Sequence, residues 1–164
     1  MFFFFFNDEK VTAMTLANYI LKRAEGKGPV TNLKLQKILY YVQGYFLAKF
    51  DRPLFPDEIQ AWKFGPVVPN VYYEFSSYGP DTLKGTEDTS SIMESSCTPA
   101  EVTLINQVID QKLKLTARRL VNDTHKETPW KEATSNGNLI RPNTVISIES
   151  MKEYFQKQGD ELNA

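Results

Sequence analysis

The stretch TNLKLQKILYYVQGYFLAKF, residues 31–50, carries apolar side chains at the spacing of a helix face. The apolar stripe consists of Leu35, Ile38, Leu39, Val42, Tyr45 and Phe46. Thr31 or Asn32 can cap this helix, because a side-chain oxygen there accepts a hydrogen bond from a free backbone N–H group. The side chains that fall largely on the opposite side are Lys34, Lys37, Tyr41 and Lys49. We therefore expect an amphipathic helix with one solvated face.

A glycine interrupts this helix at position 44. Glycine in a helix interior costs about 1 kcal/mol relative to alanine. Close approach of another part of the backbone would account for Gly44, and so would sequence drift.

Helical patterns recur on both sides of this segment, over residues 13–24, 69–78, 98–113, 116–125 and 147–155, with a short turn or helix at 128–133. Residues 59–62 are expected to form a strand that can pair with 141–146. We therefore predict a mainly α, single compact helical domain with about six helices and room for one short two-stranded β element. We place this domain at residues 12–157, after an N-terminal extension (1–11) and before a frayed tail (158–164). Residues 79–96 are rich in Gly, Ser, Thr and Asp and are expected to form a mobile loop.

The overall composition is that of a soluble globular chain with 19 basic and 20 acidic side chains. A net charge of −1 gives no general attraction to nucleic acid or to an anionic membrane. The run of Phe at positions 2–6 lacks the basic flank of a signal peptide and is far shorter than a membrane span. We expect a cytoplasmic protein without membrane attachment, and we interpret the Phe run as an appendage or as a sticky arm.

Only one Cys and one His are present, Cys97 and His125, and they are too far apart in sequence to suggest a zinc site. No Walker-type or dinucleotide-binding glycine loop occurs, so we expect no metal and no cofactor. His125 could act as a general base beside Asp123 or Glu127, which leaves a His-dependent hydrolase as an alternative. Nothing near it in sequence is an obvious nucleophile, and a His at a helix end is also expected on structural grounds. We expect its ring to pack near Trp130 or to bond a carbonyl, and we expect no enzyme.

Two further features could mark a binding surface. The basic side chains Lys34, Lys37, Arg118 and Arg119 could form a patch, but a solvated helix face is the simpler explanation and we expect no nucleic-acid partner. Aromatic side chains exceed what a small core needs, and they concentrate in residues 40–45 and 61–78. Tyr and Trp suit sites that are apolar at one end and wet at the other. We expect part of this set to be core and part to be contact surface.

Three segments carry specific patterns: TNLKLQKILYYVQGYFLAKFDRPLF (31–55), IQAWKFGPVVPNVYYEF (59–75) and THKETPW (124–130). Together they resemble the Panacea-domain antitoxin family, the GepA-like and SocA-like phage-associated proteins of bacteria and their prophages. The resemblance spans residues 12–155. The positions that match the family pattern and that we assign a structural role are Leu35, Gln36, Gly65, Pro66, Pro69, His125, Pro129 and Trp130.

The resemblance implies a chiefly helical antitoxin that neutralises a toxin encoded nearby by direct protein contact. One branch of the family acts instead as an adaptor that delivers its toxin to a cellular protease, which remains an alternative for this chain. We expect the toxin to contact a face built from the segment AWKFGPVVP (61–69) and the exposed side of the helix at 40–41. The candidate toxin-binding residues are Tyr40, Tyr41, Trp62, Phe64 and Val67.

Overall fold

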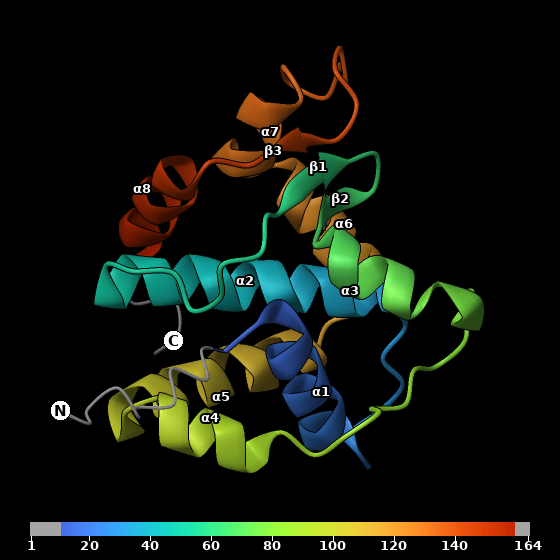
Figure 1. Cartoon of the computed structure of the whole chain (residues 1–164). Helices are drawn as coiled ribbons and strands as arrows, with labels where there is room; N and C mark the ends of the chain where they lie inside the picture. The colour runs from blue at the N-terminus through green and yellow to red at the C-terminus, as the bar shows by residue number, and fades with distance from the viewer. Residues whose placement is uncertain (1–10, 160–164) are drawn as a thin grey trace, which may run out of the picture.

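The computed structural model describes residues 11–159 and confirms a mainly α fold (Figure 1). Its α-helices are α1 (Ala13–Ala24), α2 (Asn32–Phe50), α3 (Pro69–Glu74), α4 (Ser90–Ser96), α5 (Pro99–Leu113), α6 (Ala117–His125), α7 (Thr128–Ala133) and α8 (Ile148–Gln158). The remaining elements are the 3₁₀ turn η2 (Ser76–Tyr78) and the strands β1 (Gln60–Trp62), β2 (Gly65–Val67) and β3 (Thr144–Val145). The Phe run and the end of the predicted tail lie outside the described residues. Within residues 11–159, no helix combines the length and apolar character that crossing a membrane requires.

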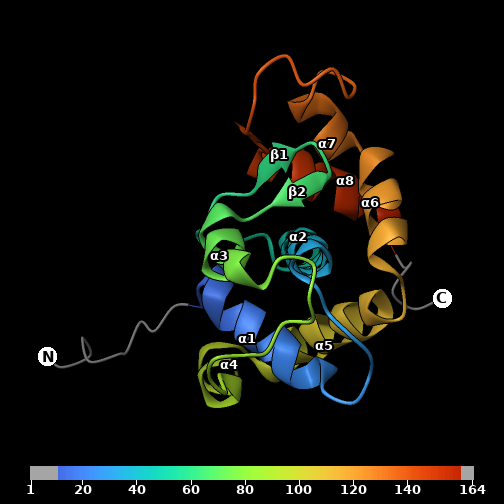
Figure 2. The same cartoon turned by 90° about the vertical axis from the view of Figure 1, so that its right-hand side faces the viewer.

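Helix α2 is the centre of the molecule. Viewed along its axis it is surrounded by the other elements, with α1 and α5 on one side and the sheet, α7 and α8 on the other (Figure 2). Thr31 caps it by accepting a hydrogen bond from the backbone N–H of Lys34 at 3.2 Å. Most of its 19 residues are buried, which is typical of a central helix rather than a surface helix.

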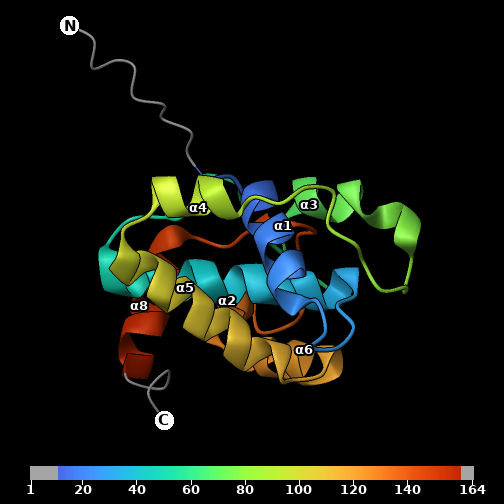
Figure 3. The ribbon, with the colours of Figure 1, turned by 90° about the horizontal axis from the view of Figure 1, so that it is seen from below.

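The expected solvated face of α2 is therefore wrong. Lys34 donates from Nζ to the carbonyl of Leu113 at 2.8 Å, and Lys37 donates to the carbonyl of Pro66 at 2.9 Å. Both side chains are buried, because the end of α5 and the β1–β2 hairpin cover this side of the helix. Seen from below, α5 crosses α2, and α6 follows it towards the α2 N-terminus (Figure 3).

Helix α8 packs closely against α2 at Gly44. A Cβ at this position would lie 2.1 Å from Cε2 of Phe155, a side chain of α8. The close neighbour is thus an aromatic ring rather than a backbone. The ring of Phe155 is held by edge contacts with Tyr40 at 5.5 Å and Tyr154 at 5.1 Å.

The small sheet has the order β2–β1–β3 and is antiparallel throughout. The predicted pairing of residues 59–62 with 141–146 is confirmed, since Gln60 faces Val145 and Ala61 faces Thr144. The sequence interpretation missed β2, which closes a tight hairpin on β1 with Trp62 opposite Gly65. Two Pro and a Gly made this segment appear irregular, yet Pro66 lies on an edge strand, where its missing N–H costs no ladder bond.

The prediction of a continuous loop over residues 79–96 is wrong in its second half, where α4 forms. Met93 is the buried side chain that anchors α4. Thr89, just before α4, donates to the carbonyl of Thr15 at 2.7 Å, and Thr86 is held by Asn18. Helix α4 therefore depends on contacts with α1, and its polar sequence gives little local signal.

Candidate functional site

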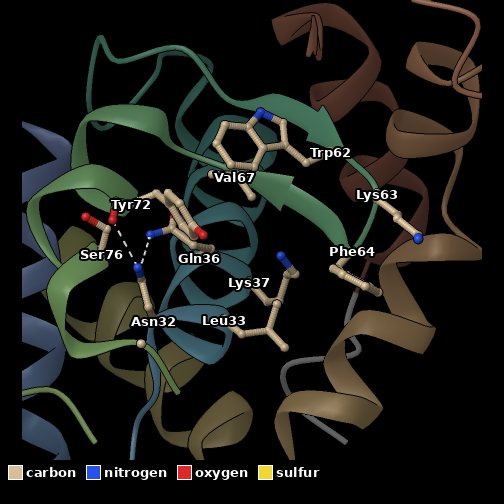
Figure 4. A pocket seen from close by; sticks show the side chains of 11 residues that line it. Asn32, Leu33, Gln36, Lys37, Trp62, Lys63, Phe64, Val67, Tyr72 and Ser76 are labelled. Atoms are coloured by element: carbon tan, nitrogen blue, oxygen red, sulfur yellow. Dashed lines mark hydrogen bonds between the residues drawn. The ribbon is translucent and has the colours of Figure 1, made fainter. Parts of the chain in front are cut away.

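A groove of about 270 Å³ opens between the β1–β2 hairpin, α3 and the first half of α2 (Figure 4). We call it the hairpin groove. Its lining residues are Asn32, Leu33, Gln36, Lys37, Trp62, Lys63, Phe64, Val67, Tyr72, Ser76 and Gly79. The groove is mostly apolar, with a few polar side chains contributed by α2, which is the usual character of a binding site.

Aromatic side chains form one wall and the rim of the groove. The ring of Trp62 packs against Tyr72 with centroids 5.0 Å apart, and Tyr72 in turn contacts Tyr73 at 5.5 Å. Tyr73 is 63% exposed and Phe64, at the hairpin turn, is 57% exposed. Large aromatic surfaces left in water beside a groove are typical of protein interaction sites.

Polar side chains of α2 fix the hairpin and α3 in place. Gln36 accepts a hydrogen bond from the backbone N–H of Val68 at 2.9 Å and donates to the side chain of Asn32. Asn32 donates to the carbonyl of Tyr72 at 3.0 Å. Figure 4 shows this chain of amides along the floor of the groove. Buried amides satisfied in this way hold a unique arrangement of the elements that they connect.

A second support lies behind the hairpin. The indole of Trp130 donates to the carbonyl of Trp62 at 2.9 Å, and the ring of His125 stacks on Trp130 at 4.0 Å. The prediction that His125 packs near Trp130 is confirmed. Its Nε2 is buried without a hydrogen-bond partner, and burial lowers the pKa of His125. A backbone hydrogen bond at Lys63 opposes that shift, so the ring is held between the indole and the hairpin backbone, and its Nε2 contacts no nucleophile within the described residues.

The other positions of the family pattern lie around these supports. Leu35 is fully buried in the core. Pro69 and Pro129 occupy the first turns of α3 and α7, where the missing N–H of proline costs nothing. Gly65 has a φ of +107°, a value that favours glycine, and it follows the hairpin turn directly.

Of the five candidate toxin-binding residues, the structure brings Trp62, Phe64 and Val67 together in the hairpin groove. Tyr40 and Tyr41 are buried, so the expectation that they lie on an exposed side of the helix is wrong. Their hydroxyls donate to the two carboxylate oxygens of Glu127, at 3.0 and 2.7 Å. The tyrosines tie α2 to the start of α7 and cannot present their rings to a partner in this fold.

The basic side chains weighed as a patch in the sequence do not form one on the surface. Lys34 and Lys37 are buried, and Arg119 pairs with Asp123 at 2.9 Å along its own helix. Cys97 is buried, and burial raises the pKa of its thiol to about 11, which disfavours the nucleophilic thiolate. Among the residues that the structure describes, no group of three or more His, Cys, Asp or Glu is placed to hold a metal ion.

The buried ionisable side chains Glu127 and Lys37 should give the protein an unusual pH dependence of stability. Burial raises the pKa of Glu127 from 4.5 to about 7, although the hydroxyls of Tyr41 and Tyr40 oppose the shift. The stability contributed by the protonated carboxyl is therefore present below pH 4.5 and lost as the pH rises through 7. Burial lowers the pKa of Lys37 from 10.5 to about 7, so its destabilisation of the fold is present in full below pH 7 and is lost as the pH rises from 7 to 10.5.

Together, the two contributions should give the free energy of unfolding a minimum near pH 7, and it should rise by on the order of a few kcal/mol on either side. Urea unfolding of the wild type, Glu127→Gln and Lys37→Met across this range measures each contribution. Glu127→Gln should remove the loss on the acid side, and Lys37→Met the recovery on the alkaline side. Wild-type and variant profiles of the same shape would contradict the prediction.

Comparison with known proteins bears directly on this arrangement. Residues 35–131 match the family described as Antitoxin SocA-like, Panacea domain. The chain is also 35% identical to Antitoxin SocA of Caulobacter vibrioides (strain NA1000 / CB15N) over 138 residues, which are 79% of this chain and 73% of that protein. No solved structure matches the chain. The matched range includes most of α2, the hairpin and the THKETPW segment, and the chain belongs to the SocA-like, Panacea-domain antitoxin family.

Proposed function

We propose that this antitoxin neutralises its toxin by binding it directly, and that the hairpin groove with its aromatic rim is the contact surface. The family supports a partner toxin in general. The observation that carries the location is the exposure of Phe64, which lines the groove, and of Tyr73, whose ring contacts the lining residues Trp62 and Tyr72. Most other large aromatics in the described part of the chain are buried in the core, so these two stand out as available for a partner.

The arrangement suits recognition of a protein. Trp62, Tyr72 and Tyr73 form one continuous aromatic surface, and aromatic residues carry much of the binding energy at protein interfaces. The hairpin beneath them is fixed by Gln36, Lys37 and Trp130, so little conformational freedom is lost when a partner binds.

The test is co-expression with the toxin encoded beside this chain, together with a binding measurement on the purified pair. The variant Phe64→Ala/Tyr73→Ala should weaken toxin binding about 100-fold or more, because two exposed anchors are lost. Its melting temperature should stay near that of the wild type, since both side chains are exposed. Ile140→Ala is the matched control, because Ile140 is a large apolar side chain that is 74% exposed and does not line the groove.

Unchanged toxin affinity in the folded double variant would show that the contact lies elsewhere. The cellular level of the toxin separates two modes of neutralisation. Direct blocking leaves the toxin abundant but inactive, whereas delivery to a protease depletes it and requires the protease.

A further inference from the structure

The ring of Phe64 lies at the turn of the β1–β2 hairpin, and it depends on the backbone of that turn for its direction. It is 57% exposed, and the ammonium group of Lys63, its neighbour in the chain, lies 5.5 Å from its centroid. In Figure 4 both side chains extend from the end of the hairpin. A side chain that is mostly in water has few neighbours to select one rotamer, so the backbone beneath it sets where it can reach. What holds the turn therefore decides what Phe64 can contact.

The backbone of the turn is held from behind by an aromatic pair, His125 of α6 and Trp130 of α7. In Figure 2 the hairpin lies between α3 and these two helices. The indole N–H of Trp130 donates to the carbonyl of Trp62 at 2.9 Å, and His125 forms a hydrogen bond with the backbone of Lys63. The two rings stack with their centroids 4.0 Å apart and their planes inclined by 23°, so each limits the movement of the other. The pair thus holds the two residues that directly precede Phe64.

The THKETPW segment (124–130) that carries this pair reaches the hairpin turn at a third point. A Cβ added to Gly65 would lie 2.8 Å from Oγ1 of Thr124. The segment is itself fixed, because the carboxylate of Glu127 accepts hydrogen bonds from two tyrosines of the central helix α2. The turn is thus attached through this segment to the core of the molecule.

We propose that His125 and Trp130 are positioning residues for toxin binding, and that they hold the hairpin turn so that the ring of Phe64 faces the partner before it arrives. This inference rests on the proposed function, because it requires Phe64 to be a contact residue. Trp130 is only 6% exposed and neither residue of the pair lines the groove, so their effect passes through the backbone of the turn. An anchor that is oriented in advance loses less conformational freedom when the partner binds.

Two conservative variants remove the hydrogen bonds to the turn and keep an aromatic ring in the stack: Trp130→Phe and His125→Phe. The matched control is Tyr19→Phe, which removes the hydrogen bond from the Tyr19 hydroxyl to Asn106 at 2.7 Å, between α1 and α5 on the other side of α2. Affinity is measured on the purified full chains with the toxin encoded beside this chain. Trp130→Phe and His125→Phe should each weaken toxin binding about fivefold, the usual worth of one hydrogen bond, whereas Tyr19→Phe should leave it unchanged.

A double-mutant cycle separates positioning of Phe64 from general support of the fold. In the Phe64→Ala background, Trp130→Phe should change the toxin affinity by less than about twofold, because no ring is left to position. A loss of the same size in both backgrounds would mean that the pair acts on binding without Phe64, and it would overturn the inference.

Backbone NMR relaxation of the free protein gives a readout that needs no toxin. The order parameter of the Phe64 amide should be about 0.85, typical of a rigid backbone, in the wild type and in Tyr19→Phe. It should fall towards about 0.6 in Trp130→Phe and His125→Phe, because the turn then loses a hydrogen bond at one of the two residues before Phe64. Unchanged order parameters in the folded variants would contradict the inference, even if their toxin affinity falls.

The two proposals fail in different ways. If Phe64→Ala/Tyr73→Ala abolishes toxin binding while Trp130→Phe and His125→Phe bind toxin normally, the contact surface is right and the positioning role is wrong. If the double variant binds toxin normally, the proposed function fails, and the pair fixes a turn that the toxin does not contact.

Discussion

Replacing Gly44 with alanine is expected to lower the free energy of unfolding by about 3 kcal/mol, at the upper end of the usual cost of overpacking. The new methyl group would lie 2.1–2.7 Å from three atoms of the Phe155 ring. That ring cannot simply move away, because Tyr40, Tyr45 and Tyr154 surround it. Thermal unfolding should show a fall in melting temperature of about 10 °C for a chain of this size.

Whether Gly44→Ala lowers or raises the free energy of unfolding tests the contact with Phe155. Alanine in a helix interior is otherwise favoured over glycine by about 1 kcal/mol, so without the ring contact Gly44→Ala would stabilise the protein. The matched test is a double-mutant cycle with Phe155→Ala, which alone should cost about 3–5 kcal/mol. In the double variant the methyl group enters the space that the ring has left, so the combined cost should be clearly less than the sum. Additive costs would show that α2 and α8 do not meet at Gly44.

The sequence predicted the helices and strands better than it predicted which side chains the fold buries. The helix at 31–50 was predictable because its apolar side chains repeat at helical spacing, and its cap is adjacent to it. The burial of Lys34 and Lys37 was not predictable, because lysine is normally exposed and the carbonyls that receive these amines lie 79 and 29 residues away in sequence. Helix α4 was missed because it buries only Met93 and its sequence is mostly Ser.

In the candidate site, too, residues that are close in sequence were predicted well and contacts between distant residues were not. Trp62, Phe64 and Val67 lie within one hairpin, so their proximity in sequence becomes proximity in space. Tyr40 and Tyr41 were assigned to the surface because aromatic side chains exceeded what a small core needs, and their partner Glu127 lies 87 and 86 residues away. Glu127 was missed as a structural residue, although the THKETPW segment that contains it had been noted. A single sequence does not reveal that a carboxylate and two tyrosines are partners.

Gly65 gives the second large effect, because its substitution should damage both the fold and the contact surface. Its φ of +107° disfavours any side chain, and an added Cβ would lie 2.8 Å from Cε of Lys37 and 2.8 Å from Oγ1 of Thr124. Gly28 is the matched control, since its φ is +115° and nothing lies within 4 Å of an added Cβ. Gly28→Ala should therefore report the backbone cost alone, about 1–2 kcal/mol. Gly65→Ala should cost about 2 kcal/mol more, as expected for an overpacked site.

The consequence for binding separates two explanations of the AWKFGPVVP segment. Relief of the clash at Gly65 requires the hairpin, Lys37 or Thr124 to shift, and a shift of the hairpin or of Lys37 alters the lining of the hairpin groove. If the segment forms the toxin contact, folded Gly65→Ala should bind toxin at least about tenfold more weakly than folded Gly28→Ala, because misplaced anchors lose their pockets. Binding is measured well below the melting temperature of each variant, so that unfolding does not contribute. Equal toxin affinities for the two folded variants would mean that the segment serves the fold alone, and that the toxin contact lies elsewhere on the molecule.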